Sequence, residues 1–91
     1  MGSANNLKVM NTFNANVLPN PATDYFTLNI SSASHNKIEI FVTDLTGRIM
    51  YSAGSSESTV FRFGRNFNSG VYLLTIIQGN DKKVMKLIKS K

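Results

Sequence analysis

The sequence predicts an all-β protein, an antiparallel β-sandwich of about seven strands, and three observations support this. Apolar residues alternate with polar ones along most of the chain, which is the pattern of strands with one buried face. Gly, Pro, Asn, Asp and Ser interrupt these runs at intervals of roughly 12 residues, as turns do. No stretch of useful length repeats with the helical period. Short strands at such a spacing are typical of a sandwich.

The size and composition of the chain fit one globular domain. It has 91 residues, of which 42% are apolar. A domain of this size buries about 60–65% of the surface of its unfolded chain, which is enough for a modest core. The absence of cysteine excludes a disulfide framework and a thiolate site. Because the Met-Gly-Ser start resembles an expression scar, we expect residues 1–6 to be scar or linker and residues 7–91 to form the domain.

Seven strands are expected from the apolar runs. In chain order they are Leu7–Phe13, Tyr25–Ile30, Lys37–Thr43, Arg48–Ser52, Ser58–Phe63, Val71–Gln78 and Lys82–Lys89. In the second and third strands, every second residue from Phe26 to Ile30 and from Ile38 to Val42 faces inward. Val71–Gln78 is apolar on both faces, which indicates a central position in its sheet.

The first long connection contains two prolines on either side of Asn20. Pro19 and Pro21 each fix φ and lack an N–H, so we expect this stretch to be extended and to lie outside any ladder. Asp24 is expected to cap the turn that leads into the following strand.

Two later connections are hairpin turns. Asp44 begins a type I turn, in which its carboxylate accepts the backbone N–H of the residue two positions on. Gly47 takes the left-handed position that closes this hairpin with a bulge. Residues 78–81 (Gln-Gly-Asn-Asp) are expected to close the last hairpin.

Tyr72 lies where a tyrosine corner is expected. In immunoglobulin-like sandwiches, a Tyr near the start of a strand bonds through its hydroxyl to the backbone a few residues upstream. Asn68 and Gly70 stand at matching positions before Tyr72. A structural role for Tyr72 is therefore favoured over a role in contacting a ligand.

The net charge is concentrated at one end of the chain. Residues 1–81 contain five bases and five acids and carry no net charge. The net charge of +5 therefore comes from the last ten residues, which include Lys82, Lys83, Lys86, Lys89 and Lys91. This is a neutral domain with a basic terminus, so its high pI does not indicate nucleic-acid binding.

Four apolar residues lie among the terminal lysines, and we expect the segment to pack as a last strand through Val84, Met85, Leu87 and Ile88. In a strand, the even-numbered residues from Lys82 to Ile88 share one face, and Met85 and Leu87 share the other. A basic interfacial helix is an alternative, but eight residues are too few for an unpacked helix. A third interpretation is a solvated edge strand whose lysines prevent aggregation.

The strand interpretation makes two groups of substitutions behave differently. Reversal of Lys83, Lys86 and Lys89 to Glu is expected to leave the fold largely intact, because exposed charges contribute little to stability. Polar replacements at the four apolar residues are expected to unfold the last hairpin.

No catalytic, cofactor-binding or metal-binding site is expected, and the chain is not predicted to be an enzyme. His35 is the single histidine, whereas a Zn site needs three or four ligands. The acids are far apart in the sequence, so no carboxylate pair is predicted. Asp24 and Asp44 lie in oxygen-rich loops, where calcium binding is a minor alternative.

Four stretches of the chain follow a fixed order: LPNPATD, DLTGRIMY, FNSGVYLLTI and KKVMKLIK. Together they resemble the type A C-terminal sorting domain of the type IX secretion system (Por secretion system) of Bacteroidota. Leu18 departs from the pattern, since an aromatic residue is frequent there. The residues that match the family's motifs are Pro19, Asn20, Pro21, Asp24, Asp44, Gly47, Arg48, Gly70 and Tyr72, followed by Lys82, Lys83, Ile88 and Lys89.

This resemblance implies a seven-stranded immunoglobulin-like sandwich at the C-terminus of a larger exported protein. Such a domain directs its cargo through the outer membrane and is then removed at the cell surface. Its partners would be the translocon, shuttle and sortase-like components and the N-terminal cargo, with no cofactor and no nucleic acid. The terminal group, together with Lys86, would be recognised by this machinery. The expected location is secreted or at the cell surface, reached through the periplasm and outer membrane.

An adhesive or carbohydrate-binding accessory module of a surface protein is the alternative. Such modules stack exposed aromatic residues on sugar rings, and the candidates here are Tyr25, Phe41, Tyr51 and Phe67, although the chain has no Trp. A strand-exchanged dimer also stays open, because an exposed edge or a mobile first strand allows exchange between copies.

Overall fold

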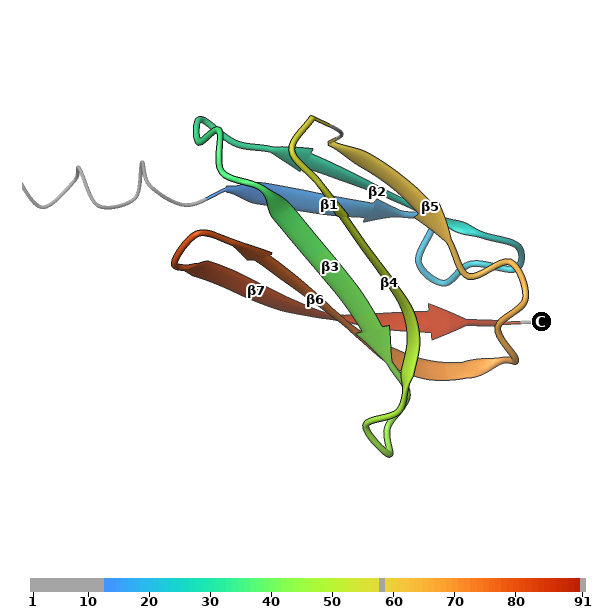
Figure 1. The fold of residues 1–91 in the computed structure, drawn as a ribbon. Coiled ribbons are helices and arrows are strands. Elements are labelled where there is room, and N and C mark those ends of the chain that lie inside the picture. Colours follow the sequence, from blue (N-terminus) through green and yellow to red (C-terminus); the bar gives the residue numbers. More distant parts are fainter. Residues whose placement is uncertain (1–12, 58, 91) are drawn as a thin grey trace, which may run out of the picture.

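The protein is a sandwich of two antiparallel sheets (Figure 1). The computed structural model describes residues 13–57 and 59–90, and within them it contains no helix that is long and apolar enough to cross a membrane. One sheet has the order β1-β2-β5 and the other the order β4-β3-β6-β7. The strands are β1 (Asn14–Leu18), β2 (Phe26–Ser31), β3 (Ile38–Thr43), β4 (Ile49–Ser55), β5 (Val60–Phe63), β6 (Gly70–Gln78) and β7 (Asp81–Lys89).

The predicted all-β sandwich is confirmed, and six strands lie close to their predicted bounds. The first strand differs. Leu7–Phe13 was expected, but residues 7–12 lie outside the described residues, and the first described strand is β1 at Asn14–Leu18. Its asparagines disfavour a strand by propensity, and pairing with β2 from Asn14↔Ser31 to Leu18↔Thr27 overrides this preference.

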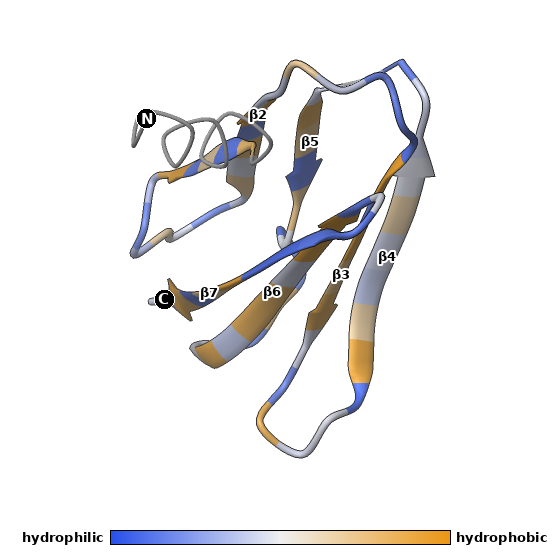
Figure 2. Ribbon diagram, turned by 90° about the vertical axis from the view of Figure 1, so that its left-hand side faces the viewer, coloured by the Kyte–Doolittle hydropathy of each residue, from blue (hydrophilic) through white to orange (hydrophobic). Residues whose placement is uncertain are grey.

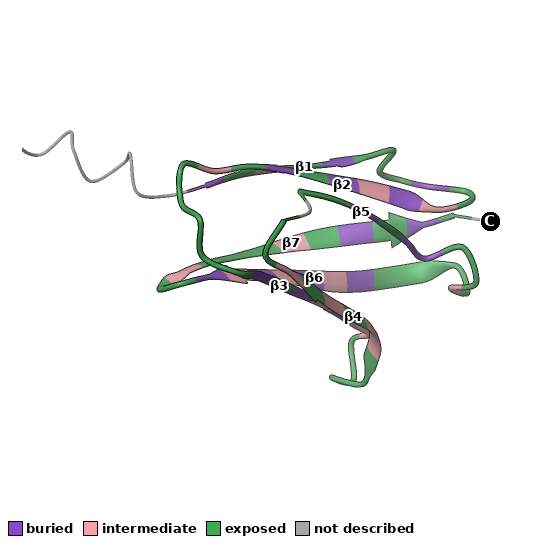
Figure 3. Cartoon of the chain, turned by 45° about the horizontal axis from the view of Figure 1, so that its top comes forward, coloured by how far each residue is buried: buried purple, intermediate pink, exposed green. Residues whose placement is uncertain are grey.

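The core lies between the sheets and is built from the inward residues of the strands (Figure 3). Period-two burial places Phe26, Leu28 and Ile30 on the inner face of β2, as expected. The inner face of β3 is likewise buried from Ile38 to Val42. β6 lies between β3 and β7, which confirms its central position. Figure 2 shows the resulting bands of apolar residues along β3 and β6.

Aromatic rings connect the two sheets near the end of β5. Tyr51 of β4 stacks on Phe63 of β5, with ring centroids 5.1 Å apart. Phe63 also stacks on Phe26, at 5.7 Å, and contacts Phe67, at 6.4 Å. The Phe67 ring in turn lies 4.7 Å from the Tyr72 ring. These rings bury large areas where the sheets diverge, and they fix the position of the loop after β5.

Candidate functional site

The basic terminus forms β7, an edge strand that pairs with β6 along nine residues from Gly70↔Lys89 to Gln78↔Asp81. This confirms the strand interpretation. The outer face of β7 carries Lys82, Val84, Lys86 and Ile88, which are all exposed. On the inner face, Leu87 is fully buried and Met85 is half-buried against the core.

The expectation that all four apolar residues hold β7 in place is wrong in part. Val84 is 55% exposed and Ile88 is 36% exposed, because they face away from the sandwich. Leu87 and Met85 are the residues that anchor β7 to the core. Val84 and Ile88 instead add apolar surface to the outer row of lysines.

Lys89 is not the exposed charge that the sequence indicates, since only 4% of its surface is accessible. Its Nζ donates hydrogen bonds to the backbone carbonyls of Gly64, Arg65 and Phe67, at 2.5, 3.1 and 3.2 Å. The three donors of the ammonium group are therefore satisfied by the loop after β5. The expectation that a reversal including Lys89 leaves the fold intact is corrected, because a buried carboxylate would face three carbonyl oxygens.

The connection between β1 and β2 covers one half of the β7 edge. The Asn20 side chain donates to the carbonyl of Lys86 at 3.0 Å and accepts the N–H of Ile88 at 2.9 Å. Ala22 forms a parallel bridge with Lys89, through its N–H to the carbonyl of Ile88. The expectation that this stretch lies outside any ladder is therefore wrong: Asn20 and Ala22 take the place of a neighbouring strand.

Within the described residues 13–57 and 59–90, no strand or connection pairs with the other half of the β7 edge. Alternate residues of an edge strand direct their N–H and C=O groups outward. Ile88 directs both groups toward the Asn20 and Ala22 connection, so Val84 and Lys82 on the same face direct theirs outward as well. Lys82 and Val84 thus combine exposed side chains with outward backbone groups that no other described residue pairs with. The neighbouring Lys83 is exposed on the opposite face, with its Nζ 5.8 Å from the centre of the Phe13 ring.

The predicted tyrosine corner is present at the start of β6. The Tyr72 hydroxyl donates a hydrogen bond of 2.6 Å to the carbonyl of Asn68, four residues upstream. Gly70 adopts φ of 154°, which L residues with a Cβ rarely do. Gly70 also pairs with Lys89 and Tyr72 with Leu87, so this motif is in direct register with β7.

The hairpin between β3 and β4 also forms as expected, and it projects away from β7 (Figure 1). The Asp44 carboxylate accepts the N–H of Thr46 at 2.9 Å and that of Arg48 at 3.0 Å. Gly47 has φ of 92°, the left-handed position of the turn. An ion pair joins Arg48 Nε to Asp44 at 3.2 Å. The side-chain hydrogen bond from Thr46 is the main cause that lowers the pKa of Asp44 below its usual value of 3.8.

A titration of Asp44 by NMR should give a midpoint below 3.8, and Thr46→Val should raise it because the largest stabilising contact of the carboxylate is removed. A lowered folded-state pKa stabilises the protein above the pKa of the unfolded chain. This contribution is lost as the pH falls below 3.8 through the folded-state value. Thr23→Val, at an exposed position elsewhere, serves as the control. An unchanged midpoint in Thr46→Val would contradict the assignment.

The remaining candidates for chemistry are dispersed. Asp24 forms an ion pair with Arg65 Nε at 3.4 Å, and His35 is exposed in the loop before β3. Within residues 13–57 and 59–90, no group of three or more His, Cys, Asp or Glu side chains is placed to hold a metal ion.

Three of the four sequence motifs therefore meet at one end of the molecule. Asn20, Gly70 and Lys89 lie in contact or in register there, whereas the Asp44 hairpin lies apart. Sequence reasoning missed the loop at residues 64–67, whose contribution is made by backbone carbonyls. Carbonyls are common to all residues, so only Gly64, with its turn propensity, gave any signal.

The sequence matches the secretion system C-terminal sorting domain family over residues 16–90. The chain belongs to this family. A sorting domain of this kind is the C-terminal signal of type IX secretion, by which an exported protein reaches the cell surface or the extracellular space. The ordered motifs and the all-β sandwich of the described residues agree with this family.

Two curated relatives match this sorting domain over only a small part of their own length. An ulvan lyase, NLR42, from Nonlabens ulvanivorans is 36% identical over 69 residues, which cover 75% of this chain and 12% of the relative. An endo-acting ulvan lyase from Formosa agariphila is 31% identical over 71 residues, 77% of this chain and 13% of the relative. The shared region is therefore about an eighth of each lyase.

Proposed function

We propose that the open edge and outer face of β7 form the surface that the type IX secretion machinery recognises. This surface consists of Lys82, Val84, Lys86 and Ile88, and we call it the β7 outer row. The observation that supports it most directly is the division of the terminal lysines. The side chains of Lys82 and Lys86 face solvent, whereas Lys89 is enclosed in the fold.

The β7 outer row fits an acidic or strand-like partner in the translocon, shuttle or sortase-like component. Exposed backbone groups at an edge accept an added strand, and alternating side chains then give specificity. The two lysines attract an acidic partner, and Val84 and Ile88 supply apolar contacts between the charges. Lys83, which is exposed on the opposite face of β7, adds positive charge next to Lys82. Lys89 supports recognition indirectly, because it fixes the end of β7.

The whole protein would carry its cargo upstream of the sorting domain, which itself contributes no catalysis. In the two ulvan lyases, the matched region is only about an eighth of the protein. By analogy, the cargo of this domain would be an enzyme. The domain would be removed at the cell surface once the cargo has been exported. The open edge would also accept a strand from a second copy of the domain.

A reporter export experiment tests the β7 outer row. Residues 5–91 are fused behind a periplasm-targeted reporter in a bacterium that has a type IX system, and surface display is measured. The double reversal Lys82→Glu and Lys86→Glu should reduce display by at least about tenfold, because attraction to the partner becomes repulsion. Both side chains are exposed, so the melting temperature should change little.

The matched control is the double reversal Lys37→Glu and Arg62→Glu, which changes the charge equally at exposed sites away from β7. It should be displayed like the parent. Normal display of the β7 reversal would show that the lysines only protect an edge. Equal loss in both variants would indicate an effect of total charge.

A further inference from the structure

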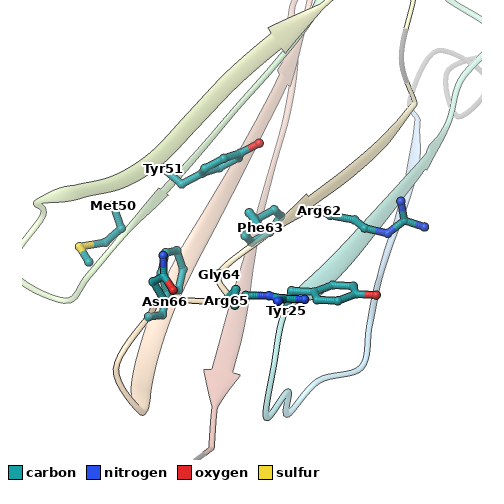
Figure 4. A pocket seen from close by; sticks show the side chains of 9 residues that line it. Tyr25, Met50, Tyr51, Arg62, Phe63, Gly64, Arg65 and Asn66 are labelled. Atoms are coloured by element: carbon teal, nitrogen blue, oxygen red, sulfur yellow. The ribbon is translucent and has the colours of Figure 1, made fainter.

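A groove lies beside the divergent end of the two sheets, on the opposite edge of the sandwich from β7 (Figure 4). Its volume is about 730 Å³, within the range of about 300–1,000 Å³ that is usual for small-ligand sites. It is lined by Tyr25 before β2, Met50 and Tyr51 of β4, Arg62 and Phe63 of β5, and residues 64–67 of the following loop.

Aromatic rings form the apolar part of this groove. Tyr25, Tyr51 and Phe67 are half-buried, so part of each ring remains accessible in the groove. Tyr51 is held in place by stacking on Phe63. Of the four aromatic residues that the sequence singled out as exposed, these three converge here, whereas Phe41 lies on β3 outside the groove.

The polar part of the groove is positively charged. No carboxylate is among its lining residues, while Arg62 and Arg65 are. The Arg65 guanidinium lies 5.5 Å from the centre of the Tyr25 ring, and its ion pair with Asp24 is solvent-exposed. Figure 4 shows the side chains of Arg65 and Tyr25 beside each other. Behind the loop, the buried Lys89 ammonium binds carbonyls, and none of the ion pairs of the described residues includes it. A concave site lined by one sign of charge attracts ligands of the opposite sign.

We propose that this groove binds an anionic oligosaccharide. Its sugar rings stack on Tyr51 and Phe67, and a carboxylate or sulfate group is held by the Arg65 guanidinium, which can donate two parallel N–H hydrogen bonds to two oxygens of either group. The Asn66 amide and the tyrosine hydroxyls supply hydrogen bonds to sugar hydroxyls. The groove favours a saccharide over an apolar peptide, because the most exposed aliphatic residues of the adjacent hairpin, Leu45 and Ile49, do not line it. This binding site is separate from the β7 outer row and does not rest on the sorting role.

An NMR titration of the 91-residue chain with tetragalacturonate tests the proposal. Resonances of Tyr51 and Asn66 should shift, and cellotetraose, a neutral saccharide of equal length, should bind at least about tenfold more weakly. Arg65→Met should weaken tetragalacturonate binding at least about tenfold. Arg48→Met is the matched control, since Arg48 is also an exposed arginine in an ion pair, 73% accessible against 68% for Arg65, and it should bind like the parent.

A second pair of variants separates stacking on the Tyr51 ring from hydrogen bonding by its hydroxyl. Tyr51→Ala should abolish the shifts at Asn66, whereas Tyr51→Phe should keep them with a smaller loss of affinity, and melting curves show whether both variants are folded. Equal affinity for cellotetraose, or equal affinity for monomeric galacturonate, would overturn the proposal. Absence of shifts at Tyr51 and Asn66 with millimolar tetragalacturonate would do so too, as would tighter binding of hexaglutamate at the same residues, which would indicate an acidic peptide.

Discussion

Replacement of Lys89 with methionine is expected to destabilise the sorting domain by about 2–4 kcal/mol. The substitution keeps most of the apolar stem but removes the ammonium group that binds the carbonyls of Gly64, Arg65 and Phe67. Hydrogen bonds to charged groups are stronger than neutral ones, and buried carbonyls that lose their donor retain the cost of their desolvation. In a domain of this size the melting temperature should fall by about 10 °C or more.

Lys86→Met is the control, because Lys86 lies on the same strand but is exposed. Its melting temperature should stay within a few degrees of the parent. Lys89→Arg should restore little stability, since a planar guanidinium cannot donate to three carbonyls that converge on one atom. If Lys89→Met melted with the parent, the contacts of Lys89 would have no role in holding β7 to the loop after β5.

Gly64→Ala is the second substitution with a large expected effect, again about 2–4 kcal/mol. Gly64 has φ of 93°, where a Cβ is strained, and a Cβ built there would lie 2.8 Å from Cδ2 of Phe26. Phe26 is fully buried and stacks on Phe63, so it has no free space into which to move. Backbone strain and overpacking therefore add at this one position.

Gly47→Ala separates these two causes. Gly47 has nearly the same φ, 92°, but a Cβ there would meet nothing within 4 Å. The loss of stability in Gly47→Ala, about 1 kcal/mol, measures the backbone strain alone. Urea denaturation of both variants gives the difference, which is the cost of the contact with Phe26. Equal losses would mean that Phe26 adapts and that the loop after β5 is less tightly packed than it appears in the structure.

Local patterns in the sequence were sufficient for most of the elements. Alternation of apolar residues places β2 to β7 near their observed positions, because strands with one buried face require that period. Asp44 and Gly47 specify their hairpin through contacts within five residues. The corner made by Tyr72 is equally local, since its hydrogen bond spans four residues.

The features of the described residues that local patterns did not indicate include several that depend on contacts between distant segments. β1 has weak strand propensity because of its asparagines, and it is stabilised by its pairing with β2. Asn20 reaches Ile88 across 68 residues, and no pattern near Asn20 indicates that its amide replaces a strand. Because two prolines flank it, the same stretch had indicated a segment without any pairing.

The sequence by itself determined that this chain is an all-β sorting domain, through strand periodicity, turn residues and the order of its motifs. Only the tertiary structure decided which terminal lysines face solvent. Lys86 and Lys89 are three residues apart and look equivalent in the sequence, yet one is exposed and the other is 4% accessible. The difference arises because Lys89 lies on the inner face of β7, opposite a loop whose backbone carbonyls satisfy its charge. The burial of a lysine depends on such partners, and they come together only when the chain folds.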